Sequence, residues 1–431
     1  MNSDFQLRSA RASIGTKVTV RGWAYNVRSS GSIVFLQLRD GTGTIQAVVS
    51  KDEVSDEAWL AAKDVTIESS VTVIGVVRED ARSPEGVELV AEGVTVVQRA
   101  KDYPIGKKEH GVDFLLDNRH LWLRSKRQTS ILLVRDTIVR AMRDCMHEMG
   151  FVLTDSPILT PTAAEGTSSL FKTDYFGEDA YLAQTGQLYI EATAAALGRV
   201  YDFGPTFRAE KSKTRRHLTE FWMLDAEAAF VEFDENIDIQ ERLVLFVLKR
   251  VLAERRGELA VLERDVALLE AIRGPFPRVT YREAIAKLKE LGATVKDGDD
   301  LGGDEETLLS KSSSQPQFIT KYPADIKAFY MKPEPEEPNY VLNDDCIAPE
   351  GYGEIIGGSQ RIDDEKLLKQ RIKDFGLREE DYQWYLDLRR YGSVPHSGFG
   401  IGLERLVTWI CGLDHVRESI PFPRLMNRIR P

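Results

Sequence analysis

The chain has 431 residues, a formal net charge of −11, and a composition of 42% hydrophobic and 29% charged residues. These values are typical of a globular protein with two or three domains and a sizeable core. Three widely spaced cysteines, Cys145, Cys346 and Cys411, argue against disulfides and a structural zinc and suit a reducing cytosol. We find no signal-peptide core and no run of about 18 apolar residues, so we expect a cytoplasmic protein with no membrane partner.

The first part of the chain carries the pattern of a small β-barrel. Residues 17–50 alternate apolar and polar side chains and break at the turn sequences SSG and DGTG. Two further alternating runs cover 65–79 and 87–100, after a short helical stretch near 52–62. Five short strands in this length predict a closed barrel of the OB-fold type, and we assign residues 1–100 to it.

The segment 101–118 is charged, contains Pro and Gly, and indicates a hinge before a second domain at 119–431. In the second domain, 124–149 predicts a helix that ends before a short strand holding Pro157. The apolar residues at helical steps in this segment are Ile131, Val134, Ile138, Met142 and Cys145. This face of the helix must be buried somewhere.

Strands and helices then mix without strict alternation. The expected elements are one or two long helices over 236–272, a helix over 280–291, a proline-rich acidic turn at 331–339, strands at 340–347 and 354–356, and a helix from Gly402. This order predicts an α+β domain whose mainly antiparallel sheet is flanked by helices.

The segment 203–227 reads as a hairpin with functional side chains on both strands. Arg208 and Glu210 share a face of the first strand, and Phe221, Asp225 and Glu227 share a face of the second. An arginine offers a planar fork to a phosphate, and an aromatic ring offers a stacking plane to a base. Such a hairpin could hold a nucleotide, although a surface hairpin with cross-strand ion pairs has the same pattern.

A second segment, 392–409, carries glycines at 398, 400 and 402 directly before an amphipathic helix that contains Arg405. Glycines let a backbone approach a ligand closely, but they also suit tight packing between a strand and a helix. Taken together, the hairpin and the glycine run favour a ligand site.

These segments resemble the signature motifs of class II aminoacyl-tRNA synthetases. FRAE (207–210) and HLTEF (217–221) resemble motif 2, within about 200–230, and GFGIGLER (398–405) resembles motif 3, within about 396–412. The helix followed by GFVLTDSPIL resembles motif 1, within about 130–160, which forms the dimer interface in that family. The first domain resembles the anticodon-binding OB-fold of the aspartate, asparagine and lysine subclass.

The resemblance implies an ATP site and assigns roles within it. Arg208 would hold the α-phosphate, Glu210 would accept hydrogen bonds from the substrate, and Phe221 and Arg405 would cover the two faces of adenine. Arg208, Glu210 and Arg405 would be catalytic. The full ATP-binding set implied is Arg208, Glu210, Arg216, His217, Leu218, Phe221, Glu354, Gly402, Leu403, Glu404 and Arg405. Magnesium would enter with ATP, bound by Glu354 and Asp345.

Two further sites follow from the resemblance. In the first domain, Phe35 would stack on an anticodon base, with Gln46 and Arg28 beside it, although the strand pattern alone also fits Phe35 as a core residue. In the second domain, the amino-acid pocket would be lined by Glu165, Gln187, Ile190, Asp225 and Arg361.

The pocket residues resemble members that use asparagine rather than aspartate. Ile190 stands where aspartyl enzymes have a lysine, so Arg361 alone would meet the substrate side chain. Asp225 departs from the glutamate usual in asparaginyl enzymes. The implied partners are tRNA(Asn), asparagine, ATP and a second copy of the chain. Open alternatives are an aspartyl enzyme, possibly one that also charges tRNA(Asn), a synthetase-like asparagine synthetase, and a catalytically silent RNA-binding protein.

Overall fold

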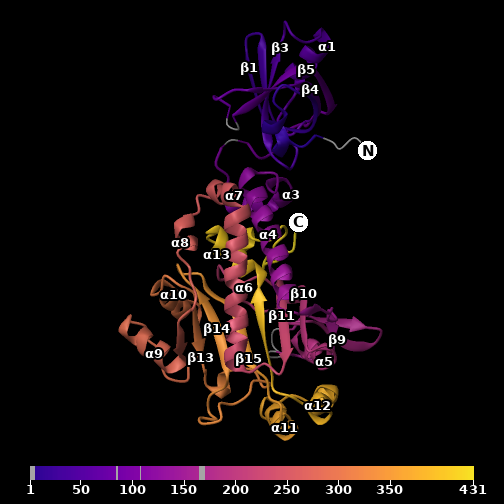
Figure 1. Cartoon of the computed structure of the whole chain (residues 1–431). Helices are drawn as coiled ribbons and strands as arrows, with labels where there is room; N and C mark the ends of the chain where they lie inside the picture. Colours follow the sequence, from indigo (N-terminus) through magenta and orange to yellow (C-terminus); the bar gives the residue numbers. More distant parts are fainter. Residues whose placement is uncertain (1–4, 84–85, 107, 165–169) are drawn as a thin grey trace. The chain divides into compact units, whose positions relative to one another are not determined.

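The computed structural model describes residues 5–83, 86–106, 108–164 and 170–431. The chain divides into two compact units, Met1–Gly111 and Val112–Pro431, which are described one at a time (Figure 1). The division falls inside the segment 101–118 that the sequence indicated as a hinge.

The first unit is a closed five-stranded barrel with the strand order β1-β2-β3-β5-β4. Its strands are β1 (Lys17–Ser30), β2 (Ile33–Arg39), β3 (Thr44–Ser50), β4 (Ser70–Glu79) and β5 (Val87–Gln98), with helix α1 (Asp56–Asp64) between β3 and β4. In β2 and β3 every second side chain is buried, as the alternation in the sequence requires. The predicted OB-fold is confirmed.

The second unit is built on an eight-stranded sheet in the order β12-β13-β14-β15-β16-β11-β10-β6. The strands are β6 (Val152–Leu153), β10 (Arg199–Phe207), β11 (Glu220–Ala229), β12 (Arg278–Thr280), β13 (Gln317–Thr320), β14 (Asn343–Ala348), β15 (Gly353–Gln360) and β16 (His396–Gly402). All neighbouring pairs are antiparallel except β12 with β13 and β10 with β6. The predicted α+β class with a mainly antiparallel sheet is confirmed.

The remaining elements surround this sheet. They are α2 (Val112–Asp117), α3 (Arg119–Trp122), α4 (Lys126–Glu148), α5 (Gln187–Leu197), α6 (Phe233–Glu254), α7 (Arg256–Val261), α8 (Val266–Glu270), α9 (Tyr281–Glu290), α10 (Gly303–Lys311), α11 (Glu365–Asp374), α12 (Gln383–Arg390) and α13 (Leu403–Cys411). A small separate sheet has the order β7-β9-β8, from β7 (Leu159–Thr160), β8 (Lys172–Tyr175) and β9 (Glu178–Leu182).

One face of helix α4 is buried within its own unit. It runs beside α6 over the sheet (Figure 1), and its apolar residues Ile131, Ile138 and Met142 are fully buried in the main hydrophobic core. The face that the sequence required to be buried therefore finds its partner inside the chain. The exposed apolar side chains of this region come later, at Val152, Leu153, Ile158 and Leu159, which are 40–45% exposed.

The segment after α4 differs from its prediction. The prediction of a single short strand holding Pro157 is wrong, because the structure has two separate strands, β6 and β7, and Pro157 belongs to neither. Proline has no N–H to give to a sheet, so the chain leaves the sheet at this point and re-enters another.

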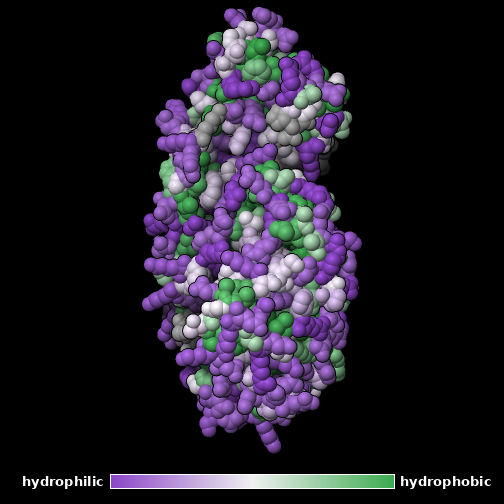
Figure 2. All heavy atoms as spheres, turned by 90° about the vertical axis from the view of Figure 1, so that its left-hand side faces the viewer, coloured by the Kyte–Doolittle hydropathy of each residue, from purple (hydrophilic) through white to green (hydrophobic). Residues whose placement is uncertain are grey.

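One face of the surface is shown in Figure 2, where hydrophilic side chains dominate and hydrophobic ones are scattered. None of the helices in the described part of the chain combines the length and the apolar character needed to cross a membrane.

Candidate active site

A row of glycines on β16 opens the sheet surface at the centre of the second unit. Gly398, Gly400 and Gly402 alternate with other residues and so share one face of the strand. A Cβ atom at Gly398 would lie 2.1 Å from Glu227 Oε1, and one at Gly400 would lie 2.6 Å from Asp225 Oδ1. These two glycines thus make room for carboxylates of the neighbouring strand β11, which pairs Asp225 with Gly400 and Glu227 with Gly398.

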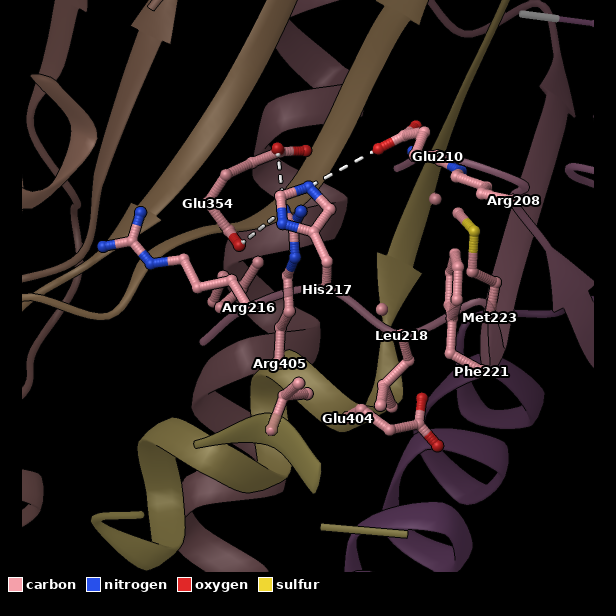
Figure 3. A pocket seen from close by; sticks show the side chains of 14 residues that line it. Arg208, Glu210, Arg216, His217, Leu218, Phe221, Met223, Glu354, Glu404 and Arg405 are labelled. Carbon is pink, nitrogen blue, oxygen red and sulfur yellow. Dashed lines mark hydrogen bonds and ion pairs between the residues drawn. The ribbon is translucent and has the colours of Figure 1, made fainter. Parts of the chain in front are cut away.

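A cavity that opens to solvent, with about 590 Å³ of empty space including its mouth, adjoins this row and is shown in Figure 3. Every residue that the sequence assigned to ATP lines it except Leu403, together with Met223, Ile355, Gly400 and Val416. Leu403 is 1% exposed and packs in the main core, so its side chain does not face the cavity. Motif residues far apart in the sequence therefore meet at one site, because β10, β11, β15 and β16 lie near one another in the sheet.

Arg208 and Phe221 form one wall of the cavity. Arg208 follows the end of β10, and its backbone N–H continues the hairpin by donating to Thr219 at 3.1 Å. Its guanidinium lies 5.5 Å from the centre of the Phe221 ring. A cation for a phosphate and a ring for a base thus stand side by side.

His217 connects the hairpin loop to Glu210. The His217 Nε2 atom lies 3.5 Å from Glu210 Oε2, and Nδ1 lies 3.2 Å from the hydroxyl of Ser212 and within hydrogen-bond distance of Thr214. Burial lowers the pKa of His217, and the positive charge of Arg405 lowers it further. A neutral ring with the proton on Nε2 fits this geometry, since Nδ1 then accepts from the hydroxyls.

Glu354 and Asp345 bring two carboxylates to one place. A Cβ atom at Gly357 would lie 3.3 Å from Glu354 Oε1 and 3.7 Å from Asp345 Oδ1, so both carboxylates lie close to this glycine. Burial raises the pKa of Asp345 while Lys327, 2.7 Å away, opposes the rise. For Glu354 burial also favours protonation, but Arg405 at 2.9 Å, Lys327 and Arg208 together outweigh it, and the pKa is lowered.

These two carboxylates fit a magnesium ion that arrives with a nucleotide. Mg²⁺ is usually bound through one or two carboxylates plus substrate phosphates rather than by a complete protein cage. The described residues include no group of three or more His, Cys, Asp and Glu side chains arranged to hold a metal.

Arg216 also lines the cavity, but its guanidinium is held by the protein. It donates to Glu306 Oε2 at 3.0 Å, to Thr307 Oγ1 at 2.6 Å and to the carbonyl of Gly351 at 2.7 Å. No sequence motif pointed to Glu306, because the short helix α10 carries none. It lies close to the cavity only through the fold.

Two buried carboxylates of β11 face the expected amino-acid pocket. Asp225 accepts hydrogen bonds from Thr185 Oγ1 at 2.7 Å and from the backbone N–H of Gly186 at 2.8 Å. Glu227 accepts from Arg361 Nε at 2.8 Å and forms an ion pair with the same guanidinium. Burial raises the pKa of Glu227, and the charge of Arg361 opposes this rise and favours the ionised carboxylate. From the sequence, Glu227 was predicted to lie in the hairpin but not to line the pocket.

The other predicted pocket residues are distributed around helix α5. Gln187 donates to Glu191 Oε1 at 3.2 Å, and Glu191 also accepts from Tyr385 at 2.7 Å and from Arg389 at 2.7 Å. Ile190 is 1% exposed and packs in a small apolar cluster with Ala194 and Val200. Glu165 lies outside the described residues.

In the first unit, the three predicted anticodon-binding residues line one pocket of about 690 Å³. Phe35 is half-buried between the fully buried Val34 and Leu36, so its ring is on the outer face of β2. The guanidinium of Arg28 lies 5.2 Å from the centre of the Phe35 ring, and Gln46 comes from the adjacent strand β3.

Comparisons with known proteins bear on both units. Residues 111–426 match the family model of class II tRNA synthetases (D, K and N), and residues 18–97 match that of the OB-fold nucleic acid binding domain. The chain is 56% identical to the asparagine–tRNA ligases of Desulforamulus reducens and Pelotomaculum thermopropionicum, with 97% of each chain covered. The crystal structure of asparaginyl-tRNA synthetase from Pyrococcus horikoshii complexed with asparaginyl-adenylate matches with a TM-score of 0.97, at 45% identity over 100% of both chains.

Proposed function

Because the chain belongs to the class II tRNA synthetases of the D, K and N type, we infer that it joins asparagine to tRNA(Asn) at the expense of ATP. In the first step the asparagine carboxylate attacks the α-phosphorus of ATP, and the bond to pyrophosphate breaks. In the second step a hydroxyl of the terminal ribose of tRNA attacks the acyl carbon of the adenylate, and AMP leaves.

The observation that carries the choice of amino acid is the buried pair of Arg361 and Glu227. Arg361 is 3% exposed, and the carboxylate of Glu227 lies against its guanidinium. The pair is neutral as a unit, so a substrate carboxylate would enter the pocket without an unbalanced cation to meet it. A neutral carboxamide can use donors and acceptors of the same pair without that cost.

For ATP, we assign Arg208 to the α-phosphate and Phe221 and Arg405 to the two faces of adenine. Arg208 would stabilise the negative charge that develops as pyrophosphate leaves. Magnesium bound by Glu354 and Asp345 would neutralise phosphate charge. His217 and Arg216 would contact the outer phosphates.

For tRNA, we assign the pocket of Phe35, Arg28 and Gln46 to the anticodon. The outward ring offers a stacking plane, Arg28 offers a positive charge, and the Gln46 amide can read a base edge. We place the reaction in the cytoplasm, where the three cysteines, all unpaired and buried, would remain reduced.

We further propose that the active form is a homodimer. The exposed apolar residues Val152, Leu153, Ile158 and Leu159 flank Pro157 and give a second copy an apolar surface to cover. Analytical ultracentrifugation of the active enzyme should give twice the chain mass of 48.6 kDa. A fully active species of single-chain mass would contradict the dimer.

Arg208→Ala is the variant that tests the catalytic assignment. We expect asparagine-dependent exchange between ATP and pyrophosphate to fall by at least about a hundredfold, because loss of a donor to transition-state charge costs roughly 3 kcal/mol. Arg199→Ala is the matched control, since Arg199 begins the same strand but pairs with Glu235 at the surface. Exchange within about twofold of wild type in Arg208→Ala would remove Arg208 from the reaction.

A further inference from the structure

The guanidinium of Arg216 is surrounded by acceptors that come from two separate segments. Glu306, Thr307 and the carbonyl of Gly303 belong to α10, and the carbonyl of Gly351 belongs to the turn between β14 and β15. Arg216 itself lies in the loop between β10 and β11, and only 10% of its side chain is exposed. A long side chain in a surface loop is therefore fixed in one position.

The turn that receives Arg216 is shaped around this contact. Gly353 has a φ of +78°, and a Cβ atom there would lie 2.4 Å from Arg216 NH1 and 2.5 Å from Glu306 Oε2. Any other residue at this position would be strained and would push the ion pair apart. The close approach of Arg216 and Glu306 thus depends on the backbone as well as on the two side chains.

Glu306 makes a second contact that reaches the magnesium-binding carboxylate. The same oxygen, Oε2, accepts the backbone N–H of Glu354 at 3.0 Å. Glu354 is in turn bound through its side chain and its carbonyl by Arg405, at 2.9 and 3.1 Å. Glu306 therefore joins Arg216 to Glu354, and through Glu354 to Arg405, at the phosphate end of the cavity.

We propose that Glu306 is a positioning residue for Mg·ATP, which fixes Arg216 and the backbone of Glu354 in the orientation that receives the outer phosphates. The proposal rests on the proposed function, because Arg216 and Glu354 take their roles from it. Glu306 itself would not touch the nucleotide. It acts by holding a cation that would otherwise lose side-chain entropy when phosphate binds.

A purely structural role for Glu306 is the competing explanation. Glu306 lies in the first turn of α10 with Asp304 and Glu305, where an acidic residue stabilises a helix through its dipole. Asp304→Asn removes such a charge from an exposed position on the same turn and is the matched control.

The test is the dissociation constant of Mg·ATP, measured by isothermal titration calorimetry on the full chain. Glu306→Gln keeps the size of the side chain and one acceptor but loses the ion pair, and we expect a rise of roughly tenfold, with a larger rise for Glu306→Ala. Asp304→Asn should remain within about twofold of wild type, as should the KM for asparagine in Glu306→Gln. Unchanged ATP affinity in Glu306→Gln would overturn the proposal. Tighter binding would also overturn it, since Glu306 would then compete with phosphate for Arg216.

A double-mutant cycle separates positioning from a general loss of structure. If Glu306 acts through Arg216, the effect of Glu306→Gln on ATP affinity should shrink to about twofold or less in an Arg216→Gln background. Full additivity would overturn the proposal. The substrate assignment is tested apart from this, because ATP binding needs no amino acid. Suppose that the wild-type enzyme binds ATP and that the variants show the expected losses of ATP affinity, but that asparagine supports no exchange between ATP and pyrophosphate. This result would contradict asparagine as the substrate and would leave the positioning role of Glu306 intact.

Discussion

At the scale of single residues, two ion pairs of the second unit are deeply buried. Arg361 with Glu227 and Arg389 with Glu191 are each almost fully enclosed. Burial favours protonation of Glu191, but Arg389 and His396 hold its pKa well below the usual range. Such pairs contribute little net stability compared with apolar packing, yet losing one partner is costly. Each pair holds its donors and acceptors in a fixed arrangement, which would suit the small polar substrate proposed above.

His415 gives a prediction about pH. Burial lowers the pKa of His415 to about 4, and Arg417 adds to the effect. Nδ1 accepts the backbone N–H of Arg417 at 3.1 Å, which only the neutral ring can do. In the unfolded chain His415 takes up a proton near the ordinary pKa of 6.5, whereas in the folded chain it stays neutral to a lower pH. The contribution to stability is therefore complete above pH 6.5 and is lost as the pH falls from 6.5 towards 4.

Urea denaturation at pH 7.5 and pH 5 measures this effect. Between pH 7.5 and pH 5 the free energy of unfolding should fall by about 1 kcal/mol more in the wild type than in His415→Gln, after allowance for the partial exposure of the ring. Glutamine can still accept the Arg417 N–H but does not titrate. An equal loss in both proteins would show that His415 is not the responsible group.

The sequence pointed to residues of one common site where a motif marked the position, and the roles of these residues stay predictions. The hairpin and the glycine run are recognisable in the sequence, so the residues that they carry could be predicted. Those that line the cavity include Arg208, Glu210, Phe221 and Arg405. Glu306 and Glu191 could not be found in that way. Their contacts come from helices that pack against the site, and nothing in the sequence relates a residue of α10 to one of β15.

At the scale of elements, β16 and β11 act together as the floor of the site. The glycines of β16 leave space that the carboxylates of β11 fill. Gly398 and Gly400 should therefore not tolerate a side chain. A Cβ atom at Gly402 would have no neighbour nearer than 3.9 Å, so this position should tolerate one.

Gly398→Ala and Gly402→Ala test this difference by thermal unfolding. A methyl at Gly398 would meet Glu227 and the carbonyl of Ala226 at about 2 Å, so we expect a loss of about 3 kcal/mol. Gly402→Ala should change stability by less than about 1 kcal/mol. Equal stability of the two variants would mean that β16 can shift away from β11.

Elements were predictable in proportion to how strongly they are patterned. The strands of the barrel and α4 have one buried and one exposed face, and their periodicity appears directly in the sequence. Helix α5 was not predicted, because its sequence QLYIEATAAAL is apolar on most sides and has no contrast between faces. The pieces β6 and β7 have only two residues each, too few for any pattern.

At the scale of the whole molecule, the chain separates anticodon recognition from chemistry. The residues assigned to the anticodon are all in the unit Met1–Gly111, and those assigned to ATP and asparagine are all in Val112–Pro431. A substitution in the first unit should therefore reduce the charging of tRNA and leave the formation of the adenylate unchanged.

Phe35→Ala should weaken aminoacylation of tRNA(Asn) by roughly tenfold or more, since one base stack is worth about 1–3 kcal/mol. Exchange between ATP and pyrophosphate should be unchanged. Trp23→Ala is the matched control, because Trp23 is also an exposed aromatic of the barrel with an arginine over its ring, Arg39, but lies outside the pocket. Equal loss in both assays would indicate that Phe35 supports the fold instead.

The most direct test of the account is exchange between ATP and pyrophosphate with asparagine and aspartate, measured on the wild-type enzyme. Because Glu227 neutralises Arg361, a substrate carboxylate would be buried without a partner, at a cost of about 3 kcal/mol or more. We therefore predict that kcat/KM for asparagine exceeds that for aspartate by at least about a hundredfold. Comparable values for the two amino acids would contradict the assignment.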